Sequence, residues 1–281
     1  MSYFFAGAWK NLRFAATLLL LALLACLAAC DYPKSVGNLR SKARDAAKGH
    51  ATPRPPSPAR AGAPRLAIIL DDFGTDRSAA ASVFSLPYPL TLSFLPFHAN
   101  SREIAEEAHR RGYQVMLHLP MQSLGNEMPE SQQLRPGMTS SQISDVVSAM
   151  LQDIPYVVGV NNHQGSLATT DGPLMADLMA ILRDRNLFFI DSRTTPATVA
   201  YDAAQDARVR CAYRNVPFLD DVEEVSAIRK QLQLAVREAQ EKGEAIAIGH
   251  PHPETLRALS EFLPQAEAQG VLLVHASDLV H

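Results

Sequence analysis

Short apolar runs alternate with amphipathic stretches over most of this 281-residue chain, and this alternation limits the fold more than any other feature. Runs such as LAIIL at 66–70 and AIAIG at 245–249 contain almost only aliphatic residues. Continuous apolar runs of this length suit parallel strands that are buried on both faces. The predicted strands are Leu66–Leu70, Leu90–Leu95, Gln114–Leu119, Val157–Asn161, Leu187–Asp191, Ala212–Val216, Ala245–Gly249 and Val271–His275.

The amphipathic stretches between these runs predict helices. The stretch at 139–154 opens with Thr-Ser-Ser-Gln, which is the spacing of a capping box, and Gly243 follows the longest stretch where a left-handed cap is expected. Repeated strand–helix units form a parallel sheet, and seven or eight of them favour an α/β fold of the incomplete TIM-like barrel type. The predicted helices are Ser101–Arg110, Thr139–Ile154, Pro173–Arg185, Val222–Lys242 and Pro253–Ala268.

The first 64 residues predict export and a tether. Lys10 and Arg13 precede an uncharged run from Phe14 to Cys30, so residues 1–30 are expected to be a signal peptide, a lipoprotein signal or a membrane anchor. The run ends in Leu-Ala-Ala-Cys, which resembles a bacterial lipobox and makes Cys30 a predicted lipidation site. Residues 31–64 include a proline-rich stretch that predicts a disordered linker. We therefore expect an exported protein, periplasmic or tethered at the periplasmic face of a membrane.

Charge and cysteine content exclude some functions. The 26 basic and 29 acidic residues nearly balance and are well mixed, so we expect no nucleic-acid partner. Cys211 is the only cysteine after residue 30, so the remaining chain has no internal disulfide. A lone cysteine is more often structural than catalytic.

Polar residues follow five of the predicted strands. Each one alone could form a turn or cap a helix. In parallel α/β folds, however, ligands bind at the carboxyl ends of the strands, and several polar groups converging there predict an active site. The strand ends in question carry Asp71, Asp72, His118, Asn161, Asn162, His163, Ser166, Asp191, Arg193, His250 and His252.

These residue types indicate metal-assisted hydrolysis. Of two adjacent carboxylates, one can bind a metal while the other acts as a base. One Asp and two His form the mixed oxygen and nitrogen set of zinc and similar sites, with a position left for water. Metal-bound water is a nucleophile near neutral pH, and a separate His can protonate the leaving group. The set therefore predicts hydrolysis of an amide or ester.

Five segments carry a resemblance to a known family. In chain order, IILDDFG, HLPM, GVNNHQGS, FIDSRT and IGHPHP resemble the divergent polysaccharide deacetylases, which are relatives of the NodB-like carbohydrate esterases. The resemblance spans residues 65–281 and implies a catalytic domain with a distorted (β/α)7 barrel. It also implies a divalent metal, zinc above all, and the removal of acetyl or other acyl groups from an amino-sugar polysaccharide of the cell envelope, through hydrolysis of a carbon–nitrogen bond.

The resemblance also suggests catalytic roles. Asp71 resembles the family's catalytic base, His250 its catalytic-acid histidine and Asp191 the carboxylate that orients this machinery. Interpreted from the residues alone, the substrate contacts would be Asn161, Asn162, Ser166, Arg193 and His252.

The predicted metal ligands depart from the family pattern. Asp72 resembles the first metal ligand and His118 the first histidine of the usual H-x-x-x-H motif. The second histidine is missing, because Gln122 stands in its place. We expect His163, from the following strand, to complete the ligand set.

Two alternatives remain open at this stage. Gln122 and the lack of tryptophan after Trp9 also fit an inert barrel that binds envelope glycan or a partner protein. A metal-dependent phosphoesterase is a third hypothesis, since Arg193 and Arg214 could meet a phosphate, but the chain shows no glycine-rich phosphate loop.

Overall fold

A single parallel sheet organises the part of the chain that the structure describes. The computed structural model describes residues 62–125 and 128–281, which all belong to one compact unit. The predicted signal segment with Cys30, and the linker up to residue 61, lie outside the described residues. The strands are β1 (Arg65–Phe73), β2 (Thr91–Phe94), β3 (Gln114–Met121), β4 (Gly159–Gln164), β5 (Phe188–Asp191), β6 (Cys211–Tyr213), β7 (Glu244–Gly249) and β8 (Leu272–Val274).

All eight predicted strands and all five predicted helices are present, with shifted ends. The capping box is confirmed: the Thr139 side chain accepts from the Gln142 amide, and Gln142 reaches back to the Thr139 amide. Gly243 adopts the expected left-handed cap at φ 89°. Two seven-residue helices, α3 and α7, were not predicted. The helices are α3 (Arg77–Val83), α4 (Ser101–Arg111), α5 (Ser140–Asp153), α6 (Gly172–Asp184), α7 (Ala200–Asp206), α8 (Val225–Lys242) and α9 (Pro253–Ala268), with 3-10 turns η2 (Ala168–Thr170) and η3 (Ala276–Leu279).

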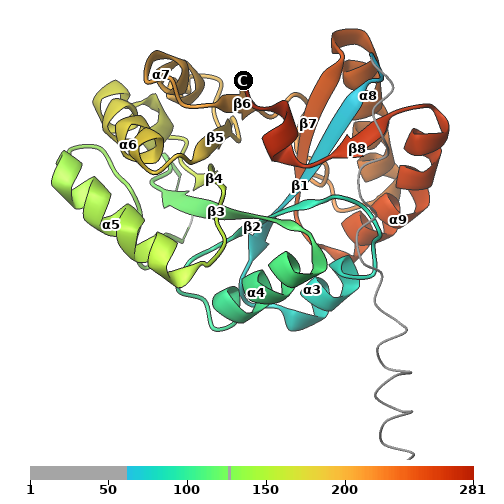
Figure 1. Cartoon of the computed structure of the whole chain (residues 1–281), viewed down its shortest axis with the longest axis horizontal. Coiled ribbons are helices and arrows are strands. Elements are labelled where there is room, and N and C mark those ends of the chain that lie inside the picture. The colour runs from blue at the N-terminus through green and yellow to red at the C-terminus, as the bar shows by residue number, and fades with distance from the viewer. Residues whose placement is uncertain (1–61, 126–127) are drawn as a thin grey trace, which may run out of the picture. The chain divides into compact units, whose positions relative to one another are not determined.

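The strands follow one another in the order β6-β5-β4-β3-β2-β1-β7, and all pairs are parallel. Strand β8 pairs with the first three residues of β1, and β2 pairs with its later half. The helices lie around the outside of the strands (Figure 1). None of the described helices is long and apolar enough to cross a lipid bilayer. The incomplete barrel expected from the alternation is therefore confirmed.

The seam between β6 and β7 is bridged without a regular strand pair. The Asn215 amide donates to the Ile246 carbonyl (2.9 Å), and the Leu219 amide donates to the Ile248 carbonyl (2.9 Å). Cys211 and His281 exchange backbone hydrogen bonds of 3.0 and 3.3 Å, which ties the last residue to the start of β6. The barrel is thus nearly closed.

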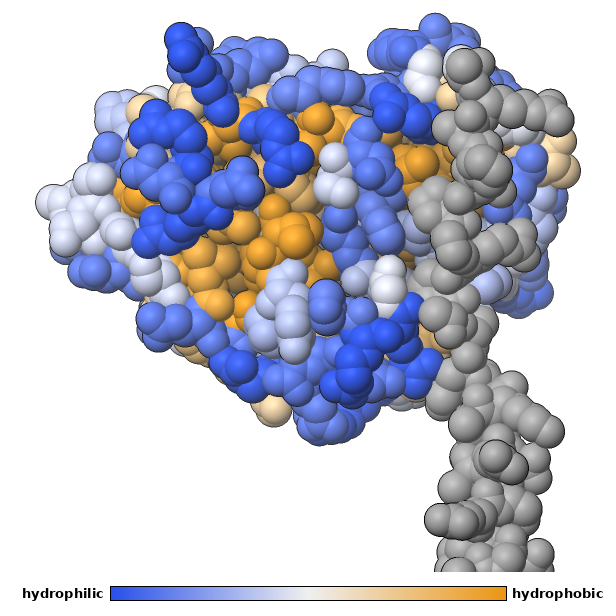
Figure 2. Space-filling model, in the orientation of Figure 1, coloured by the Kyte–Doolittle hydropathy of each residue, from blue (hydrophilic) through white to orange (hydrophobic). Residues whose placement is uncertain are grey.

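Two apolar layers hold the barrel. Every second residue of the strands points inward, among them Ala67, Ile69 and Met116, and these pack with Leu279 and Val280 from the end of the chain. The intervening residues, such as Leu66 and Ile68, pack against the helices. In Figure 2 the periphery is largely hydrophilic and an apolar area lies over the strands at the centre of Figure 1. This alternation determines which side chains reach the interior at the ends of the strands.

Candidate active site and metal centre

The alternation along β1 breaks at the acidic pair. Asp71 continues the inward series of Ala67 and Ile69, and its side chain is 1% exposed. In a regular strand Asp72 would then point outward, because successive side chains alternate between the two faces. Asp72 instead has φ 61°, and the pairing of β1 with β2 slips between Leu70 and Phe73. Asp tolerates this left-handed conformation better than most residues. The irregularity brings both carboxylates to the same end of the barrel.

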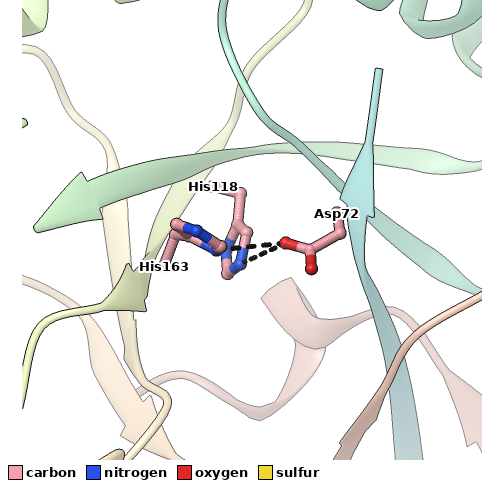
Figure 3. A group of neighbouring side chains, drawn as sticks. All are labelled: Asp72, His118 and His163. Atoms are coloured by element: carbon pink, nitrogen blue, oxygen red, sulfur yellow. Dashed lines mark ion pairs between the residues drawn. The ribbon is translucent and has the colours of Figure 1, made fainter. Parts of the chain in front are cut away.

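Asp72, His118 and His163 converge on one point (Figure 3). Asp72 Oδ1 lies 3.2 Å from His118 Nε2 and 3.1 Å from His163 Nδ1. The ligand atoms of the three residues all lie within 4.8 Å of one another. His118 is inward-facing on β3, and His163 is inward-facing on β4, where it pairs in register with Pro120.

The donor set fits a divalent metal. Asp72 Oδ1 is buried but forms no hydrogen bond to any described residue, although two ring nitrogens lie close to it. A tetrahedral ion about 2.0–2.1 Å from each ligand atom needs those atoms about 3.3 Å apart, close to the separations seen here. One carboxylate and two imidazoles form the mixed oxygen and nitrogen set that suits zinc and similar ions. An ion shared by the three groups would give the orphaned oxygen its partner.

Gln122 does not take part in this cluster. Its carbonyl accepts from the Leu167 amide (3.2 Å) and the Ala168 amide (2.9 Å), so its backbone fastens the loop after β4 to the end of β3. The residue four positions after His118 therefore supports the loop, and the imidazole that lies beside His118 and Asp72 is that of His163 on the neighbouring strand.

Asn161 connects the base candidate to the metal cluster. Its amide nitrogen lies 2.9 Å from Asp71 Oδ1 and 3.1 Å from Asp71 Oδ2. Its carbonyl oxygen lies 3.0 Å from His118 Nδ1 and 2.5 Å from Ser93 Oγ. Asn161 is fully buried.

His250 faces the metal cluster from the end of β7. Its Nε2 lies 3.8 Å from Asp72 Oδ2, and its Nδ1 lies 3.0 Å from Asp220 Oδ1. Asp220 Oδ2 also accepts from the His250 amide (2.6 Å) and the Thr255 hydroxyl (2.8 Å). The aspartate that orients the imidazole is therefore Asp220, in the loop after β6. Sequence reasoning missed it because it does not directly follow a predicted strand.

The pKa values of Asp71 and Asp72 are shifted in opposite directions. Burial raises the pKa of Asp71, and the nearby His118, His250 and Asn161 oppose this only in part. Burial also acts to raise the pKa of Asp72, but the His118 and His163 imidazoles beside the carboxylate outweigh it and leave the pKa well below its ordinary value. Asp72 is thus the permanent anion, and Asp71 is the carboxylate better suited to take up a proton.

The pKa of His250 is raised. Burial alone would lower it, but the hydrogen bond to Asp220 and the charges of Asp71, Asp220 and Asp72 raise it to about 9. His250 therefore holds a proton at neutral pH. An imidazolium at the edge of the cavity can act as a general acid.

A cavity of about 270 Å³, lined mostly by polar residues, lies next to these groups. Its only large apolar wall is Phe218, whose ring lies 5.7 Å from the His250 ring and 4.1 Å from the Arg214 guanidinium carbon. The lining residues are Asp71, Asp72, His118, Ser123, Asn162, His163, Gln164, Ser166, Thr194, Phe218 and His250.

Comparisons with known proteins identify a family for this chain. The family model described as divergent polysaccharide deacetylase matches residues 68–280. This chain belongs to that family.

One relative and two solved structures are similar to this chain. The uncharacterized protein YibQ of Escherichia coli K12 is 39% identical over 225 residues, which is 80% of this chain and 69% of YibQ. The uncharacterized protein ATU2773 of Agrobacterium tumefaciens C58 has a TM-score of 0.76 at 23% identity, covering 82% of this chain and 93% of that one. A variant of the Bacillus anthracis protein BA3943, a CE4 family pseudoenzyme with restored enzymatic activity, has a TM-score of 0.51 at 14% identity, covering 79% and 71%. The likeness to the two solved structures shows a shared fold.

Some predicted site residues of this deacetylase family member lie elsewhere. Asp191 was expected to orient the catalytic machinery, but it occupies an outward-facing position on β5. Its carboxylate accepts from the Thr198 hydroxyl (2.9 Å) and the Arg193 amide (2.8 Å). Asn161 was expected to meet sugar hydroxyls, but it is buried and its amide is already bonded on both sides. Neither side chain therefore makes the contacts that were expected of it.

Of the other expected substrate contacts, some line the cavity and some do not. Ser166 and Asn162 line the cavity, although the Ser166 hydroxyl accepts from the Leu124 amide (2.9 Å). His252 is outside the lining and lies 3.7 Å from Glu223.

The two arginines that could have met a phosphate, Arg193 and Arg214, make other contacts. Arg193 lies over the Tyr213 ring at 3.4 Å. The Arg214 guanidinium donates to the carbonyls of Ser192, Arg193 and Val216. Neither side chain lines the cavity.

Proposed function

We propose that this protein is a metal-assisted hydrolase that removes acyl groups, above all acetyl groups, from an amino-sugar polysaccharide of the cell envelope. The observation that carries the proposal is the buried Asp72 oxygen beside two imidazoles, with the Asp71 carboxylate and the His250 imidazolium close to the same cluster. Membership of the divergent polysaccharide deacetylase family supports the substrate class.

Asp72, His118 and His163 would hold the metal, and zinc matches this donor set. When bound, such an ion supplies Lewis acidity, which lowers the pKa of a coordinated water and polarises a carbonyl. The protein keeps the three ligands in place by carrying them on three strands of one sheet, β1, β3 and β4.

Asp71 and His250 would move the protons. Asp71 Oδ2 lies 3.6 Å from His118 Nε2, so the carboxylate borders the metal position and can take a proton from the attacking water. His250 holds its proton on Nε2, because Nδ1 is committed to Asp220, and can pass it to the leaving amine. Asp71 lies on β1 and His250 follows β7, so the proposed base and acid reach the cluster from different strands.

The test is release of acetate from acetylated amino-sugar polymers by the zinc-loaded protein. We expect Asp71→Asn and His250→Ala each to lower kcat/KM by about 10²- to 10⁴-fold, the range for a general base or acid. His109→Ala is the matched control, because His109 lies on α4 and stacks on Tyr156 outside the cavity. If both site variants release acetate as fast as the parent protein, the proposal is wrong.

A metal titration by calorimetry separates the enzyme from an inert glycan-binding barrel. We expect zinc, cobalt, nickel or manganese to bind at micromolar levels or tighter, and Asp72→Asn to abolish binding. Absence of binding together with absence of acetate release would favour the inert barrel.

We also propose that the protein is exported and works at the periplasmic face of a membrane, with the carbohydrate polymer as its partner. The support is the sequence of residues 1–64. Mass spectrometry of the mature N-terminus distinguishes lipidated Cys30 from a cleaved or retained signal segment.

A further inference from the structure

Asn161 contacts both the proposed base, Asp71, and a proposed metal ligand, His118. Its side chain lies between Asp71 and His118, on a strand that pairs in register with His118. We propose that Asn161 is a positioning residue that sets the proton position of His118 and the orientation of Asp71 through a single amide. This inference rests on the proposed function, because it assigns a role toward the metal and the base.

The orientation of the amide follows from its neighbours. The Asp71 carboxylate can only accept hydrogen bonds, so the NH₂ group of Asn161 must face it. The carbonyl oxygen then faces His118 and Ser93, where it can only accept. The Ser93 hydroxyl therefore donates to Asn161, and so does Nδ1 of His118.

This arrangement determines which ring nitrogen of His118 can bind a metal. With the ring proton on Nδ1, the lone pair of Nε2 points toward Asp72 Oδ1 and the proposed metal position. A second hydrogen-bond partner of this kind holds the ring in its ligating orientation, and losing it typically lowers metal affinity by about 10- to 100-fold.

The same amide holds the base. Both Asp71 oxygens lie within 3.1 Å of Asn161 Nδ2, so the carboxylate cannot rotate without losing these contacts. Asn161 has no charge, and it therefore restrains Asp71 without placing a cation beside the proposed metal.

The experiment compares Asn161→Leu with Asn161→Asp by zinc calorimetry on the full chain. Asn161→Leu removes both contacts, and we expect zinc affinity to fall by about 10- to 100-fold. Asn161→Asp keeps an acceptor for His118 but places a carboxyl group against Asp71. We expect this variant to bind zinc within about threefold of the parent protein while kcat falls by at least about 100-fold. Thr91→Val is the matched control, a buried polar residue at the start of β2, and should leave zinc affinity unchanged.

Two results would overturn the assignment. Equal zinc affinity in the parent protein and in Asn161→Leu would show that the amide does not position His118. Equal loss of affinity in both Asn161 variants would show that the acceptor facing His118 does not set zinc affinity.

A measurement without metal keeps the assignment testable if the parent protein binds no zinc, a result that would remove the proposed metal function. In the ¹⁵N-labelled protein, a protected proton on His118 Nδ1 that disappears in Asn161→Leu supports the positioning role. Its absence from the parent protein would refute that role.

Discussion

At the scale of single residues, the pairing of His250 with Asp220 determines how the proposed acid behaves. We expect Asp220→Asn to lower kcat/KM by about 10²-fold, because the imidazole loses the carboxylate that orients it. Burial opposes the charged imidazole, and Asp220 acts together with Asp71 and Asp72 to raise the pKa of His250 to about 9. An acid works only while it is protonated, so the fall in activity at high pH should move to lower pH in the variant. A pH–rate profile at saturating zinc checks this.

Zinc affinity serves as the control for that variant, since Asp220 is not among the proposed ligands. An Asp220→Asn protein that binds zinc normally but keeps the parent pH profile would contradict the assignment of Asp220.

The wrong interpretation of Asp191 has a physical cause. Strand residues alternate between the barrel interior and the helix-facing layer, and Asp71, His118, His163 and His250 are all inward. Asp191 follows the same kind of apolar run but occupies the outward position. Both layers are apolar here, so composition does not reveal which residues point inward. Sequence reasoning did not find Asp220 for a different reason: its position depends on how the loop after β6 crosses to β7.

At the scale of elements, the long strands and helices were predictable and the short helices were not. The five predicted helices carry apolar stripes over at least eleven residues. In contrast α3 has the sequence RSAAASV and α7 the sequence AYDAAQD, and neither contains enough turns for a periodic stripe. Tertiary contacts hold such short helices in place.

Tyr113 illustrates such a contact. It lies just before β3, and its buried hydroxyl donates to the carbonyls of Val83 (3.0 Å) and Leu86 (2.7 Å) at the end of α3. Burial raises the pKa of Tyr113 to about 12. The folded state therefore favours the neutral phenol, and this stabilisation is complete below pH 10. It is lost as pH rises from 10 to 12, at roughly 1.4 kcal/mol per pH unit.

We therefore expect Tyr113→Phe to be less stable than the parent protein by about 1–3 kcal/mol at pH 8, since two carbonyls lose their donor. The difference in unfolding free energy should shrink above pH 10, because the folded parent protein resists ionisation of its buried phenol and loses stability there. Urea unfolding from pH 8 to 11.5 measures it. Tyr156→Phe, at a half-exposed tyrosine, should show a constant difference. A constant difference for Tyr113→Phe as well would refute the assignment.

At the scale of the whole molecule, the two ends of the barrel have separate tasks. The proposed chemistry lies where the strands end, and the last residues of the chain close the end where the strands begin. There the Ala276 amide donates to Thr91 Oγ1 (3.0 Å), the Ser277 amide donates to Gln114 Oε1 (3.1 Å), and His281 pairs with Cys211. In parallel barrels this division lets catalytic residues vary without unfolding the protein.

Leu279 tests that division. Its side chain is 1% exposed and packs inside the barrel with Ile69 and Ile248. We expect Leu279→Ala to lower the free energy of unfolding by about 2–5 kcal/mol, the cost of a cavity in a packed core. The folded fraction should keep the zinc affinity of the parent protein, because no proposed ligand touches this region. Val222→Ala, at a side chain that is 55% exposed, is the control for stability. A fall in zinc affinity that matches the fall in stability would show that closure of the barrel and geometry of the site are coupled.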